Sequence, residues 1–342
     1  MAEDTEKKRN NHYVPQMYLR QWSNNGNTVW TYDTIAWSER QKVWESKGVG
    51  GLAYWRDFYT QANDDDSIDD SIEKLFGDEY EWKAGEPLRK VRDGETLGSN
   101  DMSALVDFAI LQMVRTPLWY MKSCALMANV FPSATTEVVD RLESEYEAGL
   151  LTASNAQDKT ASQPDSAPFP QFAFDVGVIE ETSELKITMP VGRKNYLAGI
   201  GRILNGEVGR RMRGYNWSVV EMPDGVVLPT CDNPFVRLCM RPGGRPTLDG
   251  SVGDPDVHLF MPLTPHHLLF AHAGGVSFAS SRLASEPNAT ELIAGSIVQN
   301  ALRYVYDCRK SDWITRLRPR RVDPGYCNKM ADMMKRWNEI QD

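Results

Sequence analysis

Residues 100–115, "NDMSALVDFAILQMVR", are the stretch that most restricts the fold. A helix through this stretch is apolar on nearly every face, and such a helix is stable in water only when other elements surround it. Asn100 suits the start of this helix, because its side chain can accept a hydrogen bond from a free backbone amide. We therefore predict a central helical layer inside a single large domain, for which 342 residues provide enough chain.

Strand patterns occur on both sides of this helix in the sequence. "TVWTYDT" (28–34) and "QKVWESK" (41–47) alternate β-branched and aromatic residues and predict an N-terminal β-hairpin. The last third predicts a hairpin across the turn "PDG" (223–225), two strands in "VHLFMPLTPHHLLFAH" (257–272) and a basic strand near "WITRLRP" (313–319). The expected class is therefore α+β, with the central helical layer packed on a mostly antiparallel sheet.

A carboxylate interrupts the apolar face of a second predicted helix, over residues 67–84. Ile68, Ile72 and Leu75 form its buried stripe, and the next position of that stripe is Glu79. A glycine and a proline directly after residue 84 are expected to break or kink this helix. A carboxylate on a buried face needs a polar partner or a shifted pKa.

The central helix carries a similar interruption. Its stripe begins with Leu105 and Phe108 and continues with Gln112 and Arg115. A proline two residues after Arg115 ends or kinks the helix, because proline lacks the amide hydrogen that the helix needs. Arg115 and Glu79 are candidates either for a buried ion pair or for two walls of a polar site.

The segment "NNHYVPQMYLRQW" (10–22) places three polar side chains four residues apart: His12, Gln16 and Arg20. One helical turn brings residues with this spacing to the same side. Two alternatives remain open. The three side chains form one wall of a pocket, or they only fix the N-terminal chain in place.

The block "CDNP" (231–234) supplies two further candidates, Asp232 and Asn233. Asp and Asn side chains often bond their own backbone before a proline, so an ordinary turn is one interpretation. The other is a functional role, because an aspartate at the end of a strand is a frequent metal ligand or general base.

Charge is unevenly distributed along a chain whose net charge is −9. Residues 193–213 and 309–321 are basic, whereas residues 63–81 are acidic. The two basic segments are candidates for binding nucleic acid or a small anion. The alternative is that they are ordinary solvated surfaces.

Several classes of site and location are not indicated. The five cysteines have no metal-binding spacing, and His266, His267 and His272 form no recognised zinc pattern. No phosphate-binding loop or nucleophile motif is present. The first residues lack an apolar signal region and no run is long enough to span a membrane, so a cytoplasmic protein is expected. Residues 151–168 are polar and predict a flexible surface excursion.

Seven blocks along the chain also occur, in this order, in a known family. They are "NHYVPQMYLRQW" (11–22), "DFYT" (57–60), "IEKLFGDEYEW" (72–82), "LQMVRTP" (111–117), "TCDNPFV" (230–236), "MPLTPHHLLF" (261–270) and "QNALRYVY" (299–306). The chain therefore resembles the bacterial domain-of-unknown-function family number 4238. The resemblance implies one α+β domain and brings no established activity. Cys231 stands where this pattern leads us to expect serine.

Two function classes follow from these candidates. The first is a metal-dependent hydrolase or nuclease acting on an anionic, phosphodiester-like substrate. It would use His12 as general base or metal ligand, Glu79 and Asp232 as ligands of a divalent metal, and Arg115 and Arg20 as anion clamps. The second is a non-catalytic binding or sensor module for nucleic acid or a small anion. In both classes the same polar side chains contact the ligand, with further contacts from Gln16, Gln112 and Asn233.

Overall fold

Helices and mainly antiparallel strands build the structure, which confirms the predicted α+β fold. The computed structural model describes residues 10–62, 68–148, 168–170, 172, 175–179, 184–189, 192–241, 245–273 and 287–339. The predicted excursion at 151–168 lies outside the described residues, apart from Pro168.

The described helices include a central member, which contacts α3, α5, α7 and α8. They are α1 (Gln16–Leu19), α2 (Ser71–Leu75), α3 (Trp82–Arg92), α4 (Ser99–Val114), α5 (Pro117–Glu147), α7 (Arg193–Asn205), α8 (Glu207–Arg213), α10 (Pro287–Asn300), α11 (Asp312–Leu317) and α12 (Pro324–Glu339). The central member is α4. Every residue from 105 to 114 except Asp107 is buried, as its all-round apolar sequence predicts.

Two four-stranded antiparallel sheets carry most of the β-structure. One has the order β10 (Ser218–Glu221), β14 (His267–His272), β13 (Val257–Thr264) and β12 (Val236–Cys239). The other has the order β11 (Thr230–Cys231), β15 (Tyr304–Asp307), β2 (Thr28–Asp33) and β4 (Trp44–Gly48). The short pairs are β1 (Asn10–His12) with β5 (Tyr54–Arg56), β3 (Ile35–Ala36) with β16 (Arg321–Val322), β6 (Gln61–Ala62) with β7 (Ile68–Asp69), and β8 (Asp175–Ile179) with β9 (Glu184–Thr188).

The N-terminal hairpin and the strands of 257–272 are confirmed, as the pairs β2–β4 and β13–β14. The hairpin predicted across residues 223–225 is wrong. A local turn does close there, because Val226 donates to the Pro223 carbonyl. The strands on either side then separate, since β10 pairs with β14 and β11 pairs with β15.

The basic strand predicted at 313–319 is also wrong, because these residues begin as helix α11. Ile314 is buried on its inner side. Arg318, just after the helix, donates to the carbonyl oxygens of Val298 and Ala301 at 2.8 and 2.7 Å. Val298 is in the last turn of α10 and Ala301 directly follows the helix, in the region where a helix leaves most carbonyl groups without a partner of its own. The guanidinium therefore closes the C-terminus of α10.

A π-helical turn, η3 (Phe76–Glu81), lies between α2 and α3 and changes the register of the predicted helix. Its hydrogen bonds join residues five apart, so each later side chain turns away from its α-helical position. The Glu79 side chain is 51% exposed and lies 2.5 Å from Lys83 Nζ. The prediction that Glu79 lies on a buried face is therefore wrong.

Pro87 lies inside α3 and does not end it. The predicted break at this point is wrong, because the apolar face formed by Ala84, Leu88 and Val91 is buried on both sides of the proline. Tertiary packing of that face holds the helix together, although proline costs it one backbone hydrogen bond.

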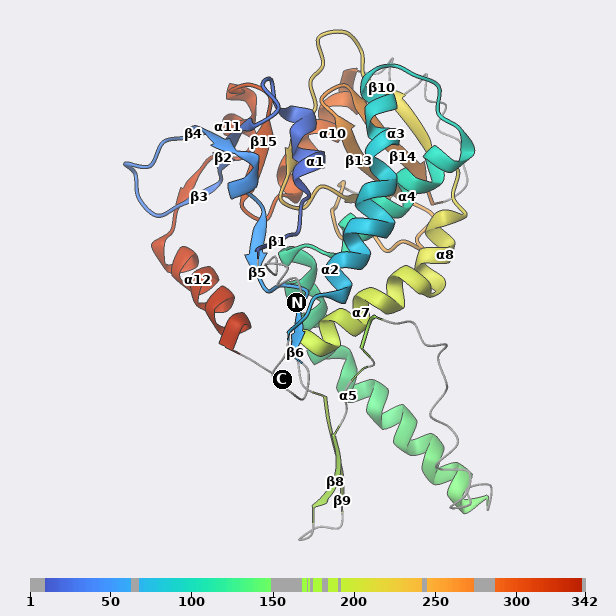
Figure 1. The fold of residues 1–342 in the computed structure, drawn as a ribbon. Coiled ribbons are helices and arrows are strands. Elements are labelled where there is room, and N and C mark those ends of the chain that lie inside the picture. Colours follow the sequence, from blue (N-terminus) through green and yellow to red (C-terminus); the bar gives the residue numbers. More distant parts are fainter. Residues whose placement is uncertain are drawn as a thin grey trace, which may run out of the picture.

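The two basic segments do not form one surface. Figure 1 shows α8, at the end of segment 193–213, and α11, within segment 309–321, on opposite sides of the molecule. Within the described residues, none of the helices has the length and apolar character needed to span a membrane.

Candidate functional site

The three polar side chains of the opening segment form one hydrogen-bonded chain. His12 Nδ1 lies 3.0 Å from the Leu52 carbonyl oxygen, and His12 Nε2 lies 3.0 Å from Gln16 Nε2. Arg20 donates to Gln16 Oε1 at 3.1 Å. Because arginine carries only donors, it orients the Gln16 amide with its nitrogen toward His12. His12 therefore carries its proton on Nδ1, and its Nε2 accepts from Gln16.

Arg115 lies at the end of α4 with its side chain completely buried. Its guanidinium donates to Glu81 Oε1 at 2.7 Å and to the His12 carbonyl oxygen. The guanidinium carbon lies 5.4 Å from the centre of the Tyr59 ring and 5.1 Å from that of Phe76. Burial is the largest single influence and acts to lower the pKa of Arg115, but Glu81, Tyr59 and Glu73 together outweigh it, so the pKa is raised. Arg115 thus joins the opening segment to the helical layer.

Asp232 is buried in the turn that follows β11. Its carboxylate accepts hydrogen bonds from the backbone amides of Leu302, Arg303 and Tyr304 at 2.7 to 2.9 Å. Burial raises its pKa to about 6, although these three amides act in the opposite direction. The neighbouring Cys231 thiol donates to the Asn233 carbonyl at 3.1 Å, a bond that serine would also make.

Asn233 links three elements in the same region. Its Oδ1 accepts from the Thr116 hydroxyl at 2.8 Å, and Asn300 Nδ2 donates to the Asn233 carbonyl at 2.7 Å. Gln112 is fully buried on α4, and neither polar atom of its amide makes a hydrogen bond within the described residues. Asp232 and Asn233 thus connect the "DNP" turn to neighbouring segments through hydrogen bonds.

The proposed metal ligands do not converge. Glu79 is on the surface with Lys83, Asp232 binds backbone amides, and both ring nitrogens of His12 have protein partners. In the part of the chain that the structure describes, no group of three His, Cys, Asp or Glu side chains is arranged to hold a metal ion.

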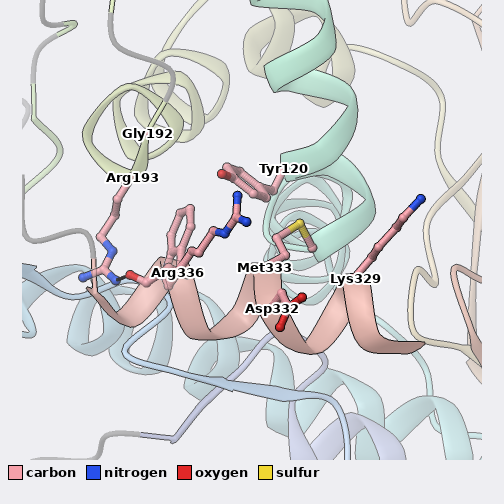
Figure 2. A pocket seen from close by; sticks show the side chains of 8 residues that line it. Tyr120, Gly192, Arg193, Lys329, Asp332, Met333 and Arg336 are labelled. Atoms are coloured by element: carbon pink, nitrogen blue, oxygen red, sulfur yellow. Dashed lines mark hydrogen bonds between the residues drawn. The ribbon is translucent and has the colours of Figure 1, made fainter. Parts of the chain in front are cut away.

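A different pocket, of about 360 Å³, opens between α5, α7 and α12. Figure 2 shows the side chains that line it. They are Tyr120 from α5, Arg193 beside Gly192 at the start of α7, and Lys329, Asp332, Met333, Arg336 and Trp337 from α12. None of these was a candidate from the sequence, apart from Arg193 as a member of a basic segment.

The aromatic residues of this pocket are held by packing. The Trp337 ring is buried, with its centre 4.7 Å from Tyr120, 5.2 Å from Phe58 and 5.8 Å from Tyr196. The guanidinium of Arg193 lies 5.0 Å from the centre of the Trp337 ring. The start of α7 and the end of α12 are therefore joined through this tryptophan.

The charged groups of the pocket differ in their surroundings. Arg193 donates to the carbonyl oxygens of Trp337 and Thr60, so it supports the wall. Arg336 is exposed and extends from α12 toward Tyr120 (Figure 2). Neither Arg336 nor Lys329 forms an ion pair with a described residue, although Asp332 lies on the same helix.

A signal for this wall exists in the sequence. Lys329, Asp332, Met333, Arg336 and Trp337 have the spacing i, i+3, i+4, i+7 and i+8, which places them on one face of a helix. That face mixes two cations, one acid and a tryptophan. The sequence does not show which other helices pack against this face, so it does not predict the pocket.

Comparison with protein families agrees with the resemblance seen in the sequence. The family model described as "Protein of unknown function (DUF4238)" matches residues 10–311. The chain belongs to the DUF4238 family. No curated protein and no solved structure gives a significant match. The DUF4238 match includes the hydrogen-bonded chain of the opening segment and the "DNP" turn, whereas the α12 wall of the pocket follows it.

Proposed function

We propose that this protein is a non-catalytic module that binds a small organic anion in the pocket between α5, α7 and α12. The observation that supports this most directly is Arg336, which extends into the pocket beside Tyr120 without an ion pair among the described residues. A volume of about 360 Å³ lies in the range of small-ligand pockets.

The surroundings of Arg336 favour an anion. Lys329 adds a second cation, and Asp332 is the single acid of the lining. Gly192 precedes the first turn of α7, where the free amides and the helix dipole favour negative charge. The Tyr120 ring offers a flat apolar surface next to these charges. A ligand with one anionic group and one flat apolar part, such as a nucleotide or an aromatic acid, has the matching chemistry.

A small anion fits better than nucleic acid. The two basic segments are on opposite sides of the molecule, and Arg318 and Arg320 donate to backbone carbonyl oxygens. Nucleic acid needs a continuous basic surface, because its affinity comes mainly from phosphate contacts. A net charge of −9 also opposes a polyanion.

The metal-dependent hydrolase has less support. It requires His12, Glu79 and Asp232 to share a ligand, and each has a separate protein partner. Arg115, assigned in that hypothesis to the substrate, has an ion pair with Glu81 and a bond to a backbone carbonyl.

Titration calorimetry with adenosine monophosphate and benzoate tests the binding proposal. We expect the wild-type chain to bind at least one of them, and Arg336→Ala to bind it about 10-fold or more weakly, the effect of losing one charge-assisted hydrogen bond. Arg40→Ala is the matched control, because Arg40 is an exposed arginine away from the pocket. Equal affinity in Arg336→Ala and wild type would refute this site.

The same preparations distinguish binding from catalysis. They are incubated with bis(p-nitrophenyl) phosphate and with Mg²⁺ or Mn²⁺. We expect no turnover above that of a protein-free control. Turnover that His12→Ala abolishes in a folded variant would overturn the non-catalytic assignment and support the hydrolase.

A further inference from the structure

Arg237 occupies an unusual position in the edge strand β12. Side chains alternate between the two faces of a strand, so Arg237 shares a face with Phe235 and Cys239, which are both buried in the core. Its guanidinium carbon lies 5.8 Å from the centre of the Trp119 ring of α5. A charged group on an apolar face costs free energy unless it has a partner of opposite charge.

A second cation, Lys122, lines the same small cavity from α5. No described residue forms a hydrogen bond or an ion pair with the charged group of Lys122 or Arg237. Burial lowers the pKa of both groups, and for Lys122 the nearby Arg237 lowers the pKa further. Asp249 acts in the opposite direction, but its carboxylate accepts from the Thr247 hydroxyl and does not reach either cation. Among the described residues, these two neighbouring cations therefore have no ion-pair partner, although the charge of Asp249 acts on both.

We propose that Lys122 and Arg237 bind a small oxyanion, a carboxylate or phosphate group, at this cavity. The flat guanidinium, which lies over the Trp119 ring, can bind two oxygens at once, and the ammonium of Lys122 adds a point charge. The cavity measures about 20 Å³, so it admits only the charged end of a ligand or a small free ion. Asn233 and Asn300 also line it.

This site is separate from the proposed pocket, since the two have no lining residue in common. It also places the "DNP" turn next to a ligand, although Asp232 itself binds backbone amides. Binding of an anion would remove the repulsion between the two cations, so the bound form would be the more stable one.

Titration calorimetry and melting curves with sodium phosphate and sodium acetate, at constant ionic strength, test the proposal. The measurement uses the full-length Arg336→Ala variant, in which the other proposed pocket lacks its main cation. We expect at least one of the two salts to bind and raise Tm. Arg237→Met, which keeps the length of the side chain without its charge, should weaken this binding at least 10-fold, and Lys122→Met should weaken it to a smaller extent.

Arg241→Met is the matched control, because Arg241 lies just beyond β12 and pairs with Asp254 on the surface. We expect it to retain full anion affinity. If Arg237→Met fails to fold, Lys122→Met decides the question, since Lys122 lies on the surface of α5 and is more exposed than Arg237. The proposal is overturned if neither salt binds to the Arg336→Ala protein, or if binding survives both methionine substitutions unchanged.

Discussion

Arg115 forms its ion pair with Glu81, at 2.7 Å, and not with Glu79, two residues earlier in the chain. The π turn between α2 and α3 makes this selection, because it rotates Glu79 to the surface and directs Glu81 toward the end of α4. The Arg115 side chain is completely buried and that of Glu81 is 24% exposed. The buried charge of Arg115 is thus neutralised by a carboxylate, Glu81, that lies at the edge of the core.

Removing the Glu81 charge should destabilise the fold. Glu81→Gln leaves a buried guanidinium without its counter-charge, which costs about 3 kcal/mol in the free energy of unfolding. Glu79→Gln should change it by less than about 1 kcal/mol, because the Glu79–Lys83 pair is exposed. Urea denaturation of both variants measures the difference. Equal losses would show that the π turn does not select between the two carboxylates.

Asp232 should make stability fall as pH rises. Its pKa in the folded chain is about 6, above the ordinary 3.8, so between these values the folded state holds a proton that the unfolded state has lost. The stabilisation that the proton on Asp232 provides is complete below about pH 4 and is lost as pH rises to about 6 and above. Relative to Asp232→Asn, which does not titrate, the wild type should lose roughly 2 to 3 kcal/mol between pH 4 and 7. A difference that is flat over this range would contradict the raised pKa.

His258 should make the stability of the fold decrease as pH falls. It faces His272 across β13 and β14, with ring centres 4.5 Å apart, and Asp256 lies nearby. Burial, and then His272, lower the pKa of His258 from 6.5 to about 4. Its contribution is therefore complete above pH 6.5 and is lost as pH falls toward 4. We compare the free energy of unfolding of the wild type with that of His258→Gln at pH 7 and at pH 5. Between these two pH values the wild type should lose roughly 2 kcal/mol more than the variant.

Helix α12 should be needed for a stable fold, although the family match ends at residue 311. Its Trp337 covers the rings of Phe58, Tyr120 and Tyr196. Trp337→Ala should cost about 3 to 5 kcal/mol, and a chain ending at residue 323 should bind the dye ANS through the uncovered rings. Lys335→Ala, on the same helix, should melt close to wild type. If the truncated chain melted at the wild-type Tm, α12 would not be needed for a stable core.

Much of the fold could be predicted because it depends on local repeats. The period of α4 and the alternation in β2 and β4 each require only neighbouring residues, and both are observed. The helical spacing applies to Gln16 and Arg20, which are hydrogen-bonded one turn apart. His12 is the last residue of strand β1, so its contact with Gln16 does not come from a helical turn. The predicted hairpin at 223–225 does not form, because β10 and β11 pair with strands of two different sheets. A local sequence pattern carries no information about such distant pairing.

The sequence by itself determined that the chain is α+β, that α4 is buried, and that Gln112 and Arg115 are polar groups inside it. Only the tertiary structure decided which partner each polar group has. Arg115 meets Glu81 through a π turn, and Asp232 meets the amides that follow α10. Both proposed sites join distant segments, α12 with α5 and α7, and β12 with α5. These contacts between distant segments depend on how whole helices and sheets pack. The hydrophobic effect is non-directional, so it does not select particular polar partners. Only the packed structure determines which charged groups have no partner.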